Sequence, residues 1–192
     1  LVYYIGHWLV PAALTKPVYA LFGLDAAWMF ARMALWGWTA LGTYLAALNL
    51  LVYLSADTGK KQGIGLLFLI FFSGMDILGA LYSSRLPDLL AYDAMHLEWW
   101  TNDFQFSSLT TCLFWVFNRT VGAWLATVCF LQEKDCRNYL LLGTACLMCG
   151  PFPFVGLVIF MVVRGIVLLA QRQKGVLQSA FSPANVLVLV VV

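Results

Sequence analysis

Long apolar stretches separated by short polar links form the main pattern of this sequence. Residues 33–56 carry no charged side chain, residues 138–163 carry none, and neither do the last 18 residues. A helix needs roughly 20 mostly apolar residues to cross the hydrocarbon core of a bilayer. The pattern therefore predicts an all-α, polytopic bundle of transmembrane helices, because a soluble domain of 192 residues has too little core for so many apolar side chains.

The polar links divide the chain into five or six predicted membrane segments. Residues 1–23 are apolar, but Pro11 and Pro17 disfavour a continuous helix, so an interfacial or kinked segment is expected there. The "GPFPF" motif at 150–154 is expected to separate two helices, since glycine and proline are strong helix breakers. The other segments are expected at about Ala26–Leu54, Gly63–Ser84, Ser107–Gln132, 138–149, 154–170 and from Ser182 onward.

We expect residues 1–192 to form one transmembrane helical domain, with residues 85–106 as a polar loop outside the membrane. The first residue lies in an apolar run, and the last eight residues, "NVLVLVVV", resemble the start of another span. The chain is therefore expected to be a fragment of a larger protein, incomplete at both ends.

Basic residues predict how the bundle is oriented. The links "SADTGKKQ", "EKDCR" and "QRQK" hold six of the eleven Lys and Arg residues, whereas the segments predicted on the opposite side hold two, Lys16 and Arg85. Short cytoplasmic loops are rich in Lys and Arg. The three links are thus expected inside, and the loop 85–106 and the "GPFPF" turn outside. The net charge of +2 gives no indication of a nucleic-acid partner.

Scarce ionisable groups gather in "YDAMHLEWW", residues 92–100, within the predicted outer loop. Asp93 and His96 share a face if this stretch is helical, and Glu98 follows closely. A carboxylate beside an imidazole acts as a general base pair or binds a divalent cation. Trp99 and Trp100 are suited to stack on a sugar or to anchor the loop at the interface. A solvated loop with aromatic anchors is the alternative interpretation.

Two charges lie inside predicted spans. Arg32 and Asp76 are expected at similar depth in neighbouring antiparallel spans, where a lone charge is costly and is usually paired or functional. We expect them to form an ion pair, with Arg119 as a competing partner for Asp76. Alternatively, these three residues line the path of a transporter or flippase.

Two further motifs have alternative interpretations. Ser107 or Ser108 is expected to cap the helix of the third span, or to mark a polar mouth where helix N–H groups face a phosphate. Cys146 and Cys149 form a C-x-x-C pair, which suggests a thiol–quinone oxidoreductase. Such enzymes need a second external cysteine pair, and packing is the simpler interpretation of these small side chains.

Several stretches resemble a group of uncharacterised bacterial multi-pass membrane proteins. These stretches are "YYIGHWLVPAALTKPVYALFG", "HLEWW…FQFSSLTTCLFWVFNRTVGAWL" and "GPFPFVGL". The group in turn resembles membrane glycosyltransferases of the GT-C type, which use a polyprenyl-phosphate sugar as donor. The resemblance implies a multi-span fold in the bacterial cytoplasmic membrane and an active site at the non-cytoplasmic face.

The resulting function hypothesis is transfer of a sugar from a polyprenyl-phosphate carrier to an acceptor outside the cytoplasm. Asp93, His96 and Glu98 are the expected catalytic residues, with or without a divalent cation. Arg85 or Arg119 is expected to hold the donor phosphate, with Ser107, Trp99 and Trp100 also expected at the substrate site.

Overall fold

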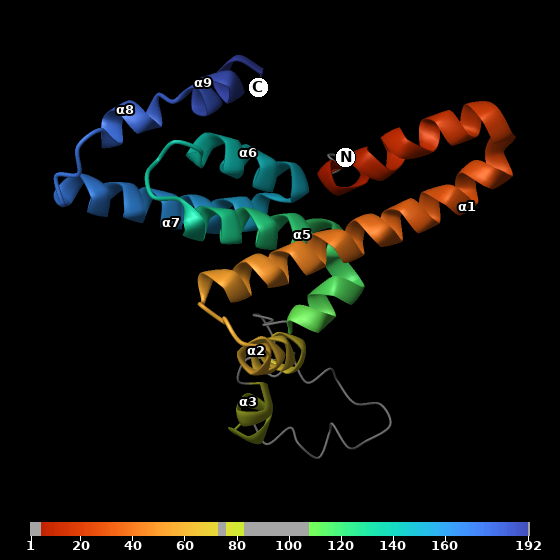
Figure 1. Ribbon diagram of the computed structural model, residues 1–192, viewed down its shortest axis with the longest axis horizontal. Coiled ribbons are helices and arrows are strands. Elements are labelled where there is room, and N and C mark those ends of the chain that lie inside the picture. The colour runs from red at the N-terminus through yellow and green to blue at the C-terminus, as the bar shows by residue number, and fades with distance from the viewer. Residues whose placement is uncertain (1–4, 73–75, 83–107, 192) are drawn as a thin grey trace. The chain divides into compact units, whose positions relative to one another are not determined.

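The computed structural model describes residues 5–72, 76–82 and 108–191, and 86% of these residues are helical, with no strand among them (Figure 1). Within this described part, three helices are long and apolar enough to cross a bilayer. They are α1 (Gly6–Tyr53), α5 (Leu109–Gln132) and α7 (Pro151–Ala170). The all-helical class is therefore confirmed, together with the presence of membrane-length helices.

The chain forms two compact units. The larger unit comprises Leu1–Ser55 and Phe117–Val192, and the smaller comprises Ala56–Val116. The division falls within α5, where Val116 has non-helical backbone angles of φ −137° and ψ 33°. The sequence pattern did not predict this irregularity in an otherwise continuous apolar helix.

In the larger unit, α1 is a hairpin of two helical arms that meet at Gly23 (Figure 1). Gly23 has φ 80° and ψ −174°, a backbone conformation that is essentially restricted to glycine. The arm after Gly23 confirms that the segment predicted at 26–54 is helical. Pro11 and Pro17 lie inside the other arm, so the expectation that they interrupt the helix is wrong. Each removes one N–H donor, but the φ of proline is close to that of a helix.

The helices α6 (Tyr139–Cys149) and α7 form a second hairpin around Gly150 (Figure 1). The predicted helices at 138–149 and 154–170 are thus confirmed, but the second starts earlier than expected. Pro151 and Pro153 lie in the first turn of α7, not in a loop. Proline is tolerated there because the first N–H groups of a helix have no partner within it. The helix is interrupted only at position 150, where the backbone is extended.

A small core joins α5 to this second hairpin. Ala126 and Phe130 of α5 pack with Cys146 of α6 and with Leu157 and Met161 of α7. Most other large apolar side chains point outward, and Trp36 and Phe152 are 76% and 82% exposed. Soluble monomers rarely expose apolar surface on this scale, so these faces are suited to lipid or to further helices.

Glycines let the helices of the larger unit approach closely. A Cβ atom at Gly42 of α1 would collide with Val121 of α5, and one at Gly122 of α5 would collide with Cys149 of α6. A Cβ at Gly6 would lie 2.8 Å from the carbonyl oxygen of Met148. Small residues commonly allow such contacts between membrane helices. They bring the start of α1, the middle of α5 and the end of α6 together.

Two short helices, α8 (Val176–Ala180) and α9 (Pro183–Val191), complete the larger unit, and α9 packs against α6. Asn185 of α9 is only 2% exposed. Its side chain accepts a hydrogen bond from the Leu140 N–H (3.0 Å) and donates to the carbonyl oxygens of Cys136 and Ala180 (2.9 Å each). Asn185 therefore caps the first turn of α6 from another helix.

The smaller unit contains α2 (Gly59–Phe71), α3 (Asp76–Tyr82) and the first turns of α5. Phe72 has an extended backbone, so the predicted single helical span at 63–84 is wrong: its helix stops at Phe71. The next residues in sequence, Ser73 and Gly74, have low helix propensity. The Thr110 hydroxyl donates to the Ile70 carbonyl (2.6 Å), one of the last carbonyls of α2.

Side-chain hydroxyl groups cap the helix starts in the smaller unit. The Ser108 hydroxyl accepts a hydrogen bond from the Thr111 N–H at 3.0 Å, which confirms the predicted cap of the third span. The Thr58 hydroxyl caps α2 by accepting from the Lys61 N–H at 3.4 Å. Lys61 also pairs with Asp57 at 2.6 Å, and this hydrogen bond lowers the pKa of the exposed Asp57 carboxyl below its ordinary value.

Candidate functional site around Arg119 and Gly150

Most of the predicted site residues lie outside the described residues, so their roles stay predictions. Asp76 opens α3, but its side chain is also outside the description, and the predicted ion pair with Arg32 is therefore untested. Arg32 itself is exposed on the second arm of α1. The residues outside the description are Arg85, Asp93, His96, Glu98, Trp99, Trp100 and Ser107.

Arg119 is the predicted phosphate-binding residue that the structure does describe. It lies on α5, and its side chain runs alongside Gly150, where α6 ends and α7 begins. The Cδ atom of Arg119 is 3.5 Å from the position that a Cβ on Gly150 would occupy, and Cγ is 3.6 Å from it. Residues 31 positions apart in the sequence thus meet at the turn of the second hairpin.

His7 lies near the same place and was not singled out from the sequence. Its side chain is 4% exposed, and Nε2 is 3.0 Å from the Thr39 hydroxyl oxygen. The Thr39 hydroxyl donates its own hydrogen to the Leu35 carbonyl at 2.8 Å. Thr39 therefore accepts from His7, and the neutral imidazole carries its proton on Nε2.

The His7 ring also packs edge-on against Phe117, with ring centroids 5.5 Å apart. Phe117 precedes Arg119 by two residues on α5, and Gly6 lies against Met148, two residues before Gly150. We call this group of residues, His7, Thr39, Phe117, Arg119 and Gly150, the Gly150 cluster. It combines a guanidinium, an imidazole and a hydroxyl in apolar surroundings.

The Gly150 cluster is better suited to bind an anion through Arg119 than through the start of α7. Helix starts bind anions through free N–H groups, but Pro151 and Pro153 have none. The Phe154 N–H already bonds the Gly150 carbonyl at 3.4 Å. A guanidinium offers five donors and a permanent charge, the usual partner of phosphate in proteins.

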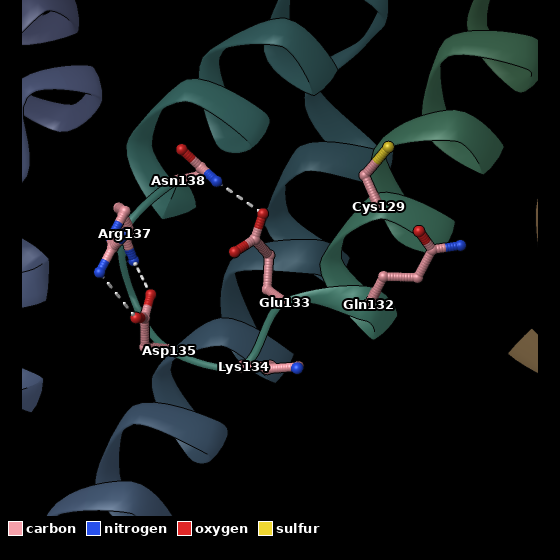
Figure 2. Close-up of a pocket in the computed structure, with 7 residues that line it drawn as sticks. All are labelled: Cys129, Gln132, Glu133, Lys134, Asp135, Arg137 and Asn138. Carbon is pink, nitrogen blue, oxygen red and sulfur yellow. Dashed lines mark hydrogen bonds and ion pairs between the residues drawn. The ribbon is translucent and has the colours of Figure 1, made fainter.

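The opposite end of the second hairpin carries a polar hollow of about 460 Å³. It lies at the link between α5 and α6, as Figure 2 shows. Within the described residues, no group of three or more His, Cys, Asp or Glu side chains is placed to hold a metal ion. The residues that line the hollow are Cys129, Gln132, Glu133, Lys134, Asp135, Arg137 and Asn138.

The C-x-x-C pair is part of the helix packing. Cys146 and Cys149 are both buried free thiols, Cys146 in the core cluster and Cys149 against Gly122 of α5. A redox couple has to be reached by its partner thiol or quinone. This burial supports the packing interpretation and not the oxidoreductase.

No family model, curated protein or solved structure matches this chain.

Proposed function

We propose that this chain is part of a multi-pass protein of the bacterial cytoplasmic membrane, with five or six membrane segments, that acts on a lipid-linked phosphate. In line with the sequence resemblance, its reaction is transfer of a sugar from a polyprenyl-phosphate carrier at the non-cytoplasmic face. The largely exposed apolar surfaces of α1, α5 and α7 support a location in the bilayer.

The second hairpin supports the proposed orientation. Arg164 of α7 donates a hydrogen bond to the Glu133 carbonyl, and Cys136 packs with Leu168 and Val176. The link "EKDCR" therefore lies beside the end of α7 that leads into "QRQK". Both basic links are at one end of the hairpin and Gly150 is at the other, as the charge pattern requires of a cytoplasmic and a non-cytoplasmic end.

The observation that carries the proposal is the position of Arg119 beside Gly150, at the end away from the basic links. In this proposal Arg119 holds the donor phosphate, and the His7–Thr39 pair fixes the first arm of α1 next to it. Asp93, His96 and Glu98 supply the general base or the ligands of a divalent cation. Arg85, Ser107, Trp99 and Trp100 contact the substrate.

The test is a transfer assay on the full-length protein in membranes, with a polyprenyl-phosphate sugar as donor. Arg119→Gln should lower transfer and donor binding by about tenfold or more, because a charged hydrogen bond to phosphate is lost. Arg119→Lys keeps the charge and should recover part of the binding. The matched control is Arg172→Gln, which removes a basic residue from the opposite end of the hairpin. Unchanged donor binding by Arg119→Gln would refute the proposed role.

A second candidate is a transporter or flippase for such a lipid, with Asp76, Arg32 and Arg119 along its path. The length of the α1 hairpin favours it. Gly23 is 16 residues from both His7 and Thr39, which corresponds to about 24 Å of helix. If Gly23 is at the outer surface, then Arg119 is deep in the bilayer and out of reach of an external acceptor.

Cysteine accessibility separates the two candidates. In the enzyme, cysteines introduced at 23 and at 150 should both react with an impermeant thiol reagent added outside intact cells. In the transporter, the cysteine at 23 should react, and the one at 150 should be shielded. Reaction at neither position would place this end of the unit on the cytoplasmic side and contradict both candidates.

A further inference from the structure

Hydrogen bonds from other parts of the larger unit fix the backbone of the link between α5 and α6, which lines the hollow. The Glu133 carbonyl accepts from Arg164 of α7, the Cys136 N–H donates to the Ser179 hydroxyl at 3.2 Å, and the Arg137 carbonyl accepts from Ser182. These contacts join the link to α7, to α8 and to the residue that precedes α9. A surface that is fixed before binding loses less entropy when a ligand arrives.

Two of the four charged side chains in the hollow neutralise one another. Arg137 contacts the Asp135 carboxylate with its guanidinium at 3.5 Å and with its backbone N–H at 2.9 Å. Figure 2 shows both contacts, and it shows Glu133 and Asn138 turned toward one another. The Asn138 amide donates to one oxygen of Glu133 at 2.7 Å.

The neighbouring Glu133 and Lys134 side chains keep their charges available to a ligand. Neither of them forms an ion pair within the part of the chain that the structure describes. The hollow thus offers one carboxylate and one ammonium group on adjacent residues. A ligand that matches both carries a negative and a positive group.

The hollow lies where apolar helix surface ends and polar link begins. Cys129, on its α5 side, is exposed, and Leu140 and Leu141 of α6 are about two-fifths exposed. In a bilayer, this boundary coincides with the layer of lipid headgroups. The hollow has a volume of about 460 Å³ and is open at the surface, as a site for the headgroup of a lipid has to be.

We propose that this hollow binds phosphoethanolamine, as the headgroup of a membrane lipid of the cytoplasmic leaflet. Lys134 pairs with the phosphate, and Glu133 accepts hydrogen bonds from the primary ammonium. A choline headgroup has no N–H to donate to Glu133, and a glycerol headgroup has no cation for it. The proposal depends on the proposed membrane location and orientation, but not on sugar transfer.

The experiment measures lipid retained by the full chain in nanodiscs, by native mass spectrometry. The discs contain phosphatidylcholine with equal small fractions of phosphatidylethanolamine and phosphatidylglycerol. We expect preferential retention of phosphatidylethanolamine. Glu133→Gln and Lys134→Gln should each reduce it about two- to fivefold, the effect of losing one partly exposed ion pair. Glu133→Gln keeps the oxygen that Asn138 needs, so the link should remain folded.

Lys174→Gln is the matched control, because it removes an exposed lysine from the next basic link. Competition by soluble phosphoethanolamine tests the source of the ligand: displacement at millimolar concentration shows that the headgroup alone is bound, and its absence shows that the acyl chains contribute. Equal retention of all three lipids, or equal losses for Lys134→Gln and Lys174→Gln, would overturn the proposal.

Discussion

The larger unit contains two helical hairpins that both turn at a glycine, but only one of the two turns requires this residue. At Gly23 in α1, the backbone needs a conformation that other residues avoid, while no atom lies within 4 Å of a hypothetical Cβ. At Gly150, the backbone is extended (φ 173°, ψ 149°), and a Cβ would meet Arg119 and Pro153 at ordinary contact distance. The backbone conformation requires glycine at position 23. At position 150, neither the backbone conformation nor the space around it requires glycine.

The interiors of the two hairpins also differ. The arms of α1 share one partly buried side-chain hydrogen bond, between His7 and Thr39. The hairpin of α6 and α7 shares an apolar core with α5, and Asn185 of α9 completes the hydrogen bonding at its polar end. The first hairpin therefore depends on its turn and on one polar pair, whereas the second depends on tertiary contacts from elements outside it.

The largest expected effect is at the polar end of the second hairpin. Asn185→Ala removes the partner of the Leu140 N–H, which is partly buried, and of the Cys136 carbonyl, which is buried. We expect a loss of about 3 kcal/mol of stability in detergent, because each unsatisfied group costs about 1–3 kcal/mol. Gln178→Ala, at an exposed position of α8, is the control and should change the stability by less than about 0.5 kcal/mol. A similar small change for Asn185→Ala would show that α6 is not capped from α9.

The two turn glycines should respond to alanine with opposite signs. Gly23→Ala should destabilise the protein by about 2 kcal/mol, the strain of a non-glycine residue in this backbone region. Gly150→Ala should be neutral or stabilise by about 0.5 kcal/mol, since alanine fits an extended conformation before proline and is more restricted when unfolded. Thermal unfolding of both variants in the same detergent measures this. Equal destabilisation by both would contradict the distinction between the two turns.

Substitutions at His7 and at Thr39, the polar pair inside α1, should destabilise the protein to different extents. Thr39→Val leaves the buried His7 Nε2–H without its partner and should destabilise by about 1–2 kcal/mol. His7→Leu should have a smaller effect, because the Thr39 hydroxyl keeps its hydrogen bond to Leu35. Thr39→Ser retains the hydroxyl and serves as the control. If His7→Leu is the more damaging change, packing of the imidazole and not its hydrogen bond holds the arms together.

The smallest expected effect is a pH dependence of the second hairpin. Burial raises the pKa of the Cys136 thiol above its ordinary value of 9.0. The neutral thiol therefore stabilises the fold fully below about pH 9, and this contribution is lost as the pH rises through the raised pKa. The unfolding midpoint should fall as the pH rises above about 9, and Cys136→Ala should make that fall shallower. Identical pH profiles for the two proteins would exclude Cys136 as a source of the effect.

Local patterns predicted much of the secondary structure. The apolar stretches predicted the ends of α7 and of the second arm of α1 to within a few residues. Ser108 caps α5 as expected. These features depend on neighbours within about one turn of helix, which are visible in the sequence. The predicted outer loop with Asp93, His96 and Glu98 lies outside the described residues, so that part of the proposed site stays a prediction.

The sequence by itself determined the all-helical class, the apolar lengths and the asymmetry of basic residues, because each depends on composition within a short window. Only the tertiary structure decided that His7 meets Thr39, that Arg119 lies beside Gly150 and that Asn185 caps α6. Each of these contacts joins residues more than 30 positions apart. One residue added to an intervening helix rotates the following side chains by about 100°, so such contacts depend on the summed geometry of whole helices and turns.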